Sequence, residues 1–288
     1  MSTSIHPAAH VSPKAQLGRD VVVGPGAVIE GGVVIGDGTH IGPHAVIMEY
    51  TTLGRECRVH AHAVLGDRPQ DIGFSGHPSF LVVGDRCVIR EGVTMHRGTK
   101  AETTTVVGEG GFFMANSHVA HNCRIGRGVV LANGALLAGY VEIGDRAFIS
   151  GNVLIHQFCR IGRLAMLAGG GAFNKDVPPF CTTQGVAPNI VVGLNVVGMR
   201  RAGIAPACRL EIRRAFKVLY RSGLNVSQAL ERLRREFDSE PVRELADFIE
   251  ASKRGICRHI ARGIRDDREE HDDDGVWHPT GVQGTSRP

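Results

Sequence analysis

Large apolar residues recur at every sixth position over more than half of this chain. Counting by six from Ile5 to Phe173 gives 29 positions, and 26 of them carry Val, Ile, Leu, Met or Phe. The pattern keeps its phase across the three exceptions, which are Asp71, His77 and Ala101. An α-helix requires apolar spacings of three and four, and an isolated strand alternates with a spacing of two, so neither explains a spacing of six.

The repeat predicts an all-β fold, the left-handed parallel β-helix built from hexapeptides. In that architecture three short strands make one triangular coil, and every sixth side chain points into a shared core. The repeat from Ile5 to Phe173 corresponds to roughly nine coils. Glycine often follows the apolar residue, as at Gly36 and Gly108, and we interpret these glycines as bends with φ values that other residues resist.

The rest of the chain is expected to be organised around this β-helix. The two interruptions of the repeat predict loops that leave the prism and return in phase, and loops on a rigid scaffold commonly carry binding residues. Beyond residue 203 the apolar spacing becomes helical, with helix starts at Pro206, at Asn225 and near Pro241. The expected units are a β-helix at 1–185 with loops at 67–81 and 97–105, a linker at 186–203, a helical domain at 204–262, and a disordered tail at 263–288.

Composition favours a cytoplasmic protein. No apolar run reaches the roughly 18 residues of a membrane span, and the N-terminus lacks the features of a signal peptide. The net charge of +4 suits an anionic substrate or an acidic carrier protein, whereas no dense basic stripe indicates nucleic-acid binding. Four of the seven cysteines share one register, four residues after a repeat position, which predicts packing and a reducing compartment: Cys57, Cys87, Cys123 and Cys159.

The chemistry is predicted in the segment 116–123, NSHVAHNC, which contains His118 and His121. One coil is three hexads, so adding 18 to 121 gives Gly139 and adding 18 again gives Gln157. We therefore expect His121 to face the backbone of Gly139, whose carbonyl would fix the imidazole tautomer and whose amide would stabilise an oxyanion. This is the geometry of a general base in acyl transfer.

Two further interpretations of these histidines remain open. A lone histidine is commonly a solvated or hydrogen-bonded surface residue. A zinc site is the second possibility, since imidazole is a common zinc ligand, but the zinc carbonic anhydrases built on a β-helix space their ligand pair more widely than His118 and His121. We expect no metal. The histidines that could supply such ligands are His60, His62, His96, His118, His121 and His156.

Several longer strings resemble one enzyme family. They are GDRPQD (66–71), IREGVTMHRGT (89–99), NSHVAHNC (116–123), LANGALLAGYVEIGD (131–145), IHQFCRIG (155–162), DVPPF (176–180) and FKVLYRSG (216–223). In this order they are similar to the acyl-[acyl-carrier-protein]:UDP-N-acetylglucosamine O-acyltransferases, which begin lipid A synthesis. The resemblance covers about residues 5 to 260.

The resemblance implies a homotrimer without a separate cofactor, because the acyl group arrives on the phosphopantetheine arm of acyl carrier protein. His121 would take the proton from the sugar 3-hydroxyl, which attacks the thioester of a 3-hydroxyacyl chain, and the amide of Gly139 would hold the oxyanion. The implied role of Gly169 is to set the acyl length. The implied substrate contacts are Gln70, Asp71, His96, His118, His156 and Gln157, with Asn195 and Arg201 near the nucleotide phosphates.

The sequence departs from the family pattern where polar contacts are usual. Gly73 stands where the family has a loop lysine, and Tyr140 stands where it has a histidine. Asn122 replaces an acid beside His121. Val197 and Ala202 replace charged residues. A sugar nucleotide with an amine at position 3 therefore stays open as the acceptor. Three different functions also stay open: the N-acyltransferase acting later in the same pathway, a coenzyme A dependent acetyltransferase, and a catalytically silent binding homologue.

Overall fold

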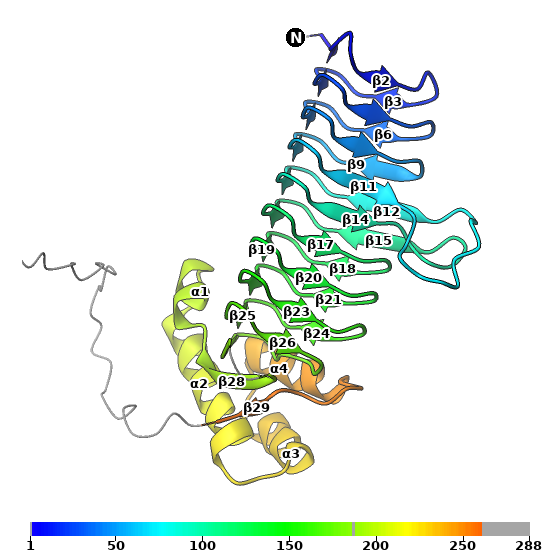
Figure 1. The fold of residues 1–288 in the computed structure, drawn as a ribbon. Helices are drawn as coiled ribbons and strands as arrows, with labels where there is room; N and C mark the ends of the chain where they lie inside the picture. The colour runs from blue at the N-terminus through cyan, green and yellow to red at the C-terminus, as the bar shows by residue number, and fades with distance from the viewer. Residues whose placement is uncertain (1, 186–187, 261–288) are drawn as a thin grey trace, which may run out of the picture.

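Three sheets of short parallel strands form a triangular prism, and helices lie at its C-terminal end (Figure 1). The computed structural model describes residues 2–185 and 188–260. Most strands pair with the equivalent strand of the next coil, as in the register of His118 with Leu136 and Val119 with Leu137. The predicted β-helix is therefore confirmed, together with the coil length of 18 residues on which the prediction for His121 depends.

Successive strands occupy the three sheets in turn. The first sheet contains β1 (Ser4–Ile5), β4 (Val22–Val23), β7 (His40–Ile41), β10 (Arg58–Val59), β13 (Val88–Ile89), β16 (Phe112–Phe113), β19 (Val130–Leu131), β22 (Phe148–Ile149), β25 (Met166–Leu167), β27 (Cys181–Thr183), β28 (Ile190–Leu194) and β29 (Arg258–His259). The second contains β2 (His10–Val11), β5 (Val28–Ile29), β8 (Val46–Ile47), β11 (Val64–Asp67), β14 (Thr94–His96), β17 (His118–Val119), β20 (Leu136–Leu137), β23 (Leu154–Ile155) and β26 (Ala172–Phe173). The third contains β3 (Gln16–Leu17), β6 (Val34–Ile35), β9 (Thr51–Leu53), β12 (Phe80–Val83), β15 (Thr104–Val107), β18 (Arg124–Ile125), β21 (Glu142–Ile143) and β24 (Arg160–Ile161).

The repeat residues form the core of the prism. Every apolar repeat residue from Val23 to Phe173 is at most 4% exposed, whereas Ile5 in the first coil is 45% exposed. Ile5 is exposed because it lies at the end of the prism, where a coil covers it on one side only. The four cysteines of the shared register are all 0% exposed, which confirms their role in packing.

Most glycines after the repeat residues are needed for close approach of the coils, not for an unusual φ as expected; Gly66, with a φ of 84°, is the exception. A Cβ on Gly36 would lie 2.6 Å from the carbonyl carbon of Gly54, and a Cβ on Gly108 would lie 2.7 Å from that of Gly126. The left-handed residue of this corner comes two positions later, as at Gly38, where φ is 69°. Adjacent coils are therefore too close at these positions for any side chain.

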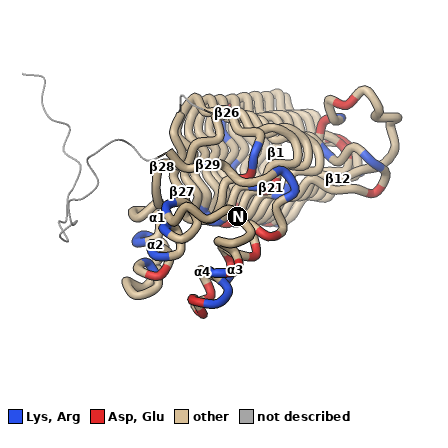
Figure 2. The backbone as a smooth tube through the Cα atoms, turned by 90° about the horizontal axis from the view of Figure 1, so that it is seen from below, with Lys and Arg blue, Asp and Glu red and all other residues tan. Residues whose placement is uncertain are grey.

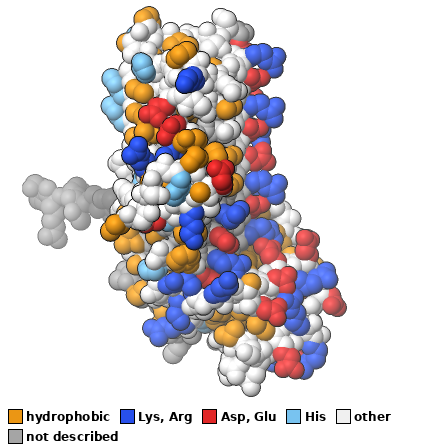
Figure 3. All heavy atoms as spheres, turned by 90° about the vertical axis from the view of Figure 1, so that its right-hand side faces the viewer, with side chains coloured by type: hydrophobic (Ala, Val, Ile, Leu, Met, Phe, Trp, Pro, Cys, Tyr) orange, Lys and Arg blue, Asp and Glu red, His pale blue; other side chains and the backbone are white. Residues whose placement is uncertain are grey.

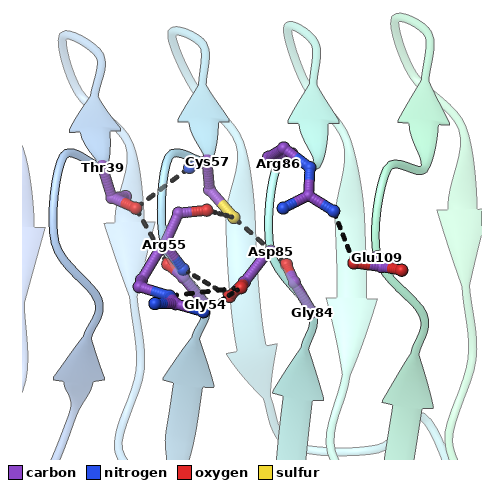
Figure 4. Close-up of polar contacts among 8 residues, drawn as sticks. All are labelled: Thr39, Gly54, Arg55, Cys57, Gly84, Asp85, Arg86 and Glu109. Carbon is purple, nitrogen blue, oxygen red and sulfur yellow. Dashed lines mark hydrogen bonds and ion pairs between the residues drawn. The ribbon is translucent and has the colours of Figure 1, made fainter.

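At the corner between the third and first sheets, an arginine of one coil repeatedly pairs with an aspartate of the next coil (Figures 3 and 4). The Asp85 carboxylate accepts hydrogen bonds from the backbone amide of Arg55 at 2.8 Å and from its guanidinium at 3.0 and 3.2 Å. The pairs Arg19–Asp37 and Arg127–Asp145 repeat this arrangement. Such exposed pairs contribute little to stability individually, but they favour one alignment of neighbouring coils.

Two loops project from the prism, one between β11 and β12 and one between β14 and β15 (Figure 1). Arg97, at the start of the second loop, is only 2% exposed. Its guanidinium lies 4.9 Å from the ring centre of Tyr50 and 5.6 Å from that of Phe74, and it pairs with Glu49 at 3.2 Å. Arg97 therefore holds the first loop, through Phe74, against the body of the prism.

The C-terminal region contains α1 (Val196–Arg201), α2 (Pro206–Arg221), α3 (Val226–Glu236) and α4 (Glu240–Glu250). α2 has Pro206 in its first turn, and α3 begins with a capping box between Asn225 and Gln228. A second apolar core joins these helices to the end of the prism. Its largest members are Leu164, Phe180, Met199, Ile212, Leu219, Leu233, Leu245 and Ile249.

The segment expected to be a linker, 186–203, contains regular structure instead. β28 pairs antiparallel with β27, and its first two residues, Ile190 and Val191, are at most 1% exposed. The side chain of Asn195 then accepts a hydrogen bond from the amide of Gly198 and caps α1. The prediction was wrong because the glycine and asparagine of this segment serve a strand end and a helix cap. The expected tail at 263–288 lies outside the described residues.

Candidate active site

A groove of about 620 Å³ runs along the outer face of the second sheet and the corner that follows it. Its floor is apolar, because the outward side chains of β20, β23 and β26 are Leu136, Leu154 and Ala172. Its rim is polar and brings together six of the residues predicted from sequence. These are Gln70, His118, His121, Gly139, His156 and Gln157.

Asn122 fixes the orientation of His121. The Asn122 Oδ1 atom lies 3.1 Å from His121 Nδ1 and also accepts a hydrogen bond of 2.9 Å from the amide of Thr99. Because this oxygen is an acceptor, Nδ1 carries the proton and Nε2 keeps its lone pair. His121 is thus oriented with Nε2 as the basic atom, and the expected acid beside it is replaced by an amide that supplies the same acceptor.

Gly139 faces the His121 ring as the coil length predicted. A Cβ at Gly139 would lie 2.7 Å from His121 Nε2, so only glycine leaves the ring in this position. His121 Nδ1 bonds Asn122 and not the Gly139 carbonyl, which accepts a bond of 3.2 Å from the amide of Phe158, so this carbonyl does not fix the tautomer, contrary to expectation. Within residues 2–185 and 188–260 the Gly139 amide donates to no partner, so it is available to a ligand.

Two histidines beside His121 are kept neutral. His118 Nδ1 lies 2.7 Å from Thr94 Oγ1, and the His96 ring packs edge-on against His118 with the ring centres 4.8 Å apart. Burial lowers the pKa of His118 to about 4, and the neighbouring His96 and His121 contribute to this lowering. His96 is 5% exposed and does not line the groove, and burial also lowers its pKa. Neither ring adds positive charge around His121 at neutral pH.

The low pKa of His118 predicts a loss of stability in mild acid. An unfolded histidine titrates near 6.5, whereas folded His118 titrates near 4, so the unfolded state binds the proton first as the pH falls. The free energy of unfolding should therefore decrease from pH 6.5 to about 4. We expect His118→Gln to flatten this decrease in urea titrations at several pH values. Parallel curves for the two proteins would contradict the assignment.

The first loop carries Asp71 close to this cluster. Its carboxylate accepts hydrogen bonds from Thr99 Oγ1 at 2.6 Å and from the amide of Gly73 at 2.9 Å. These bonds, together with the charge of His121, lower the pKa of Asp71. Asp71 is therefore ionised near His121 and can stabilise an imidazolium when one forms. Gly73, where a lysine was expected, contributes its backbone amide.

Three predicted residues lie away from the groove. Asn195 and Arg201 line a second groove of about 610 Å³, against Phe148 and Met166 on the outer face of the first sheet. Asn195 also bonds the carbonyl of Leu164 at 2.8 Å, so its side-chain amide connects α1 to the prism. Gly169 lies at the corner between the first and second sheets, outside both grooves. A single chain does not bring these residues to His121.

The structure adds residues that the sequence interpretation missed. Thr99 bonds both Asp71 and Asn122, which couples the two loops to the histidine segment. Tyr140 packs edge-on against His121 at 5.4 Å and stacks on Phe158 at 4.9 Å. Tyr140 and Phe158 are 18 residues apart, so the coil length predicts that they stack. No sequence signal indicates the contacts of Thr99.

A hexapeptide β-helix with an oriented base above an apolar groove defines a hexapeptide-repeat acyltransferase. The bacterial transferase hexapeptide profile matches residues 32–67 and 104–139, and that of UDP-N-acetylglucosamine O-acyltransferase, domain 2, matches 176–257. The chain belongs to the UDP-N-acetylglucosamine O-acyltransferase family. The acyl-[acyl-carrier-protein]–UDP-N-acetylglucosamine O-acyltransferase of Chlorobaculum parvum is 53% identical over 254 residues, which are 88% of this chain and 96% of that protein.

A further relative and a solved structure support the same family assignment. The same enzyme from Halorhodospira halophila is 46% identical, over 89% of this chain and 100% of that protein. The UDP-N-acetylglucosamine acyltransferase of Bacteroides fragilis superposes with a TM-score of 0.84 at 38% identity, over 88% of this chain and 100% of that one. Among the described residues, no helix has the length and hydropathy needed to cross a membrane, and no cluster of three His, Cys, Asp or Glu residues is placed to hold a metal ion.

Proposed function

We propose that this protein transfers a 3-hydroxyacyl chain from acyl carrier protein to the 3-hydroxyl of UDP-N-acetylglucosamine. The observation that carries the proposal is the pairing of His121 Nε2, free as a base, with the unbonded amide of Gly139 one coil away. A base and an oxyanion donor on adjacent coils are what acyl transfer to a hydroxyl requires.

The reaction follows from these groups. His121 Nε2 takes the proton of the sugar 3-hydroxyl while the hydroxyl oxygen attacks the carbonyl carbon of the thioester. The amide of Gly139 stabilises the oxyanion that results. The imidazolium is stabilised by the nearby Asp71 carboxylate. Collapse of the intermediate breaks the carbon–sulfur bond, and the imidazolium returns the proton to the departing thiol. The products are the acylated sugar nucleotide and free carrier protein.

The floor of the groove supports a long acyl chain. Leu136 and Leu154 are 42% and 50% exposed, and they follow one another on adjacent coils about 4.8 Å apart. An extended alkyl chain along these coils would cover both side chains and gain hydrophobic stabilisation. Gln70, Asp71, His118, His156 and Gln157 would bind the sugar end, with His96 supporting His118 from beneath.

A homotrimer would complete the site. Asn195 and Arg201 face the first sheet whereas His121 lies by the second, so one chain cannot bind both ends of a sugar nucleotide. A neighbouring copy would bring the two grooves together and would place Gly169 near the end of the acyl chain. The wholly exposed Ile72 of the first loop would then have a surface to cover it. We place the enzyme in the cytoplasm, since all seven cysteines are free.

Mass spectrometry of the reaction products tests the proposal. The protein is incubated with a panel of 3-hydroxyacyl carrier proteins and either UDP-N-acetylglucosamine or its 3-amino analogue. We expect the plain sugar to gain one hydroxyacyl group as an ester, which mild alkali removes. An alkali-resistant product formed only from the 3-amino analogue would show that the modified sugar nucleotide is the acceptor. No product from either sugar nucleotide would show that the protein is a catalytically silent homologue.

A further inference from the structure

The exposed face of α2 is strongly basic. Arg213, Arg214 and Lys217 are all exposed, whereas Ile212, Ala215, Phe216 and Leu219 on the opposite face are buried. Lys217 lies four residues after Arg213 and three after Arg214, so the three cations are neighbours on the helix surface. Leu210, which is 47% exposed, lies on the same face. We call Arg213, Arg214 and Lys217 the basic face of α2.

The basic face differs from α3 and α4 in having no acidic partners among the residues that the structure describes. On α3, Arg232 pairs with Glu236 at 3.1 Å, and Arg234 pairs with Glu250 of α4 at 2.7 Å. Within the described part of the chain, the three cations of the basic face form no ion pair. Figure 2 shows mostly blue on α1 and α2, with Glu211 the one acidic residue of α2, and both colours on α3 and α4. Adjacent like charges repel, so this surface should attract an anionic partner.

The chain itself supplies an anionic segment of suitable length. Residues 266–274, DDREEHDDD, contain seven carboxylates and one arginine. The described chain ends beside α2, where the His259 ring lies 5.3 Å from that of Phe216 and 5.6 Å from that of Tyr220. Six further residues span up to about 20 Å when extended, whereas Arg213 lies only about 12 Å along the helix from Arg221. Phe216 lies on the opposite face, so the chain must also pass around α2, which is about 10 Å in diameter. The acidic segment of nine residues that follows can still reach the basic face.

We propose that residues 266–274 bind the basic face of α2 within the same chain and compete there with acyl carrier protein. The proposal rests on the proposed function, because it assigns the acidic carrier to the same cations. A tethered segment has a high effective concentration, so even weak ion pairs would keep the face partly occupied. The family profile ends at residue 257, which makes this competition a property of this chain beyond the family's core.

Kinetics with the full chain test the competition. One variant replaces the seven carboxylates of 266–274 by their amides, and a matched control ends at Gly275 and so keeps the acidic segment. At low salt we expect the neutral variant to lower the KM for acyl carrier protein by about 3- to 10-fold, the effect of a few exposed ion pairs. kcat and the KM for the sugar nucleotide should not change, the control should match the full chain, and high salt should remove the difference. An unchanged or higher KM in the neutral variant would overturn the proposal.

A binding measurement separates this proposal from the proposed function. Trp277 is the only tryptophan of the chain and lies three residues after the acidic segment, so its fluorescence anisotropy reports on the tail without any reaction. We expect anisotropy to fall when salt or unacylated carrier protein is added, and to be low from the start in the Arg213→Gln/Arg214→Gln/Lys217→Gln variant. Equal anisotropy under all these conditions would overturn the docking. Failure of acyl transfer in every variant, with the anisotropy changes intact, would instead reject the proposed function alone.

Discussion

His121→Ala should lower kcat/KM for acyl transfer by about 10²- to 10⁴-fold, the usual contribution of a general base. The variant loses Nε2, the atom that would accept the proton of the sugar hydroxyl, while Asn122 keeps its bonds to Thr99 and Thr105. The corner of the prism should therefore remain intact. A coupled assay that detects the free thiol of the carrier protein measures the effect, and thermal unfolding checks the fold.

A histidine at another corner provides the matched control. His62 lies between the first and second sheets and stacks on His44, with the ring centres 5.3 Å apart, outside both grooves. His62→Ala should keep the activity of the unaltered protein. If His121→Ala also transferred the acyl chain at a near-normal rate, the site would have to lie elsewhere.

Gly139→Ala should lower activity by about 100-fold while leaving the fold intact. The added Cβ would lie 2.7 Å from His121 Nε2 and still closer to Cε1, so the imidazole must move. Gly139 is not among the residues with positive φ, and alanine therefore fits its backbone conformation. Displacing a catalytic group by about 1 Å can cost a factor of 10². We expect the loss in kcat, with little change in the denaturant midpoint.

Gly31 occupies the equivalent turn position at the same corner, two residues after Ile29 of β5. A Cβ there would lie 3.4 Å from Ser12 Oγ, an ordinary contact. Gly31→Ala should therefore leave both activity and stability unchanged. Equal activities for the Gly139→Ala and Gly31→Ala proteins would show that the space around His121 does not matter for the reaction.

Much of the fold could be predicted because the repeat is local and regular. A spacing of six fixes both the direction of the side chains and the step of 18 residues between coils, so Gly139 and Gln157 follow from His121 by counting. The prediction failed at the segment 186–203, beyond the end of the repeat, where the composition in glycine and asparagine indicated a linker. There a strand forms because β27 offers an edge and the prism end buries Ile190, and neither condition is visible in the segment itself.

The amino-acid sequence by itself determined the β-helix, the packing of the cysteines and the position of His121 above Gly139, because each depends only on the period of the repeat. Only the tertiary structure decided what orients the base. Asn122, Thr99 and Asp71 meet through two loops that leave the repeat, and no periodicity relates a loop to the coils it covers. The tertiary structure also placed Asn195 and Arg201 on another face, since the path of α1 is set by long-range packing against the end of the prism.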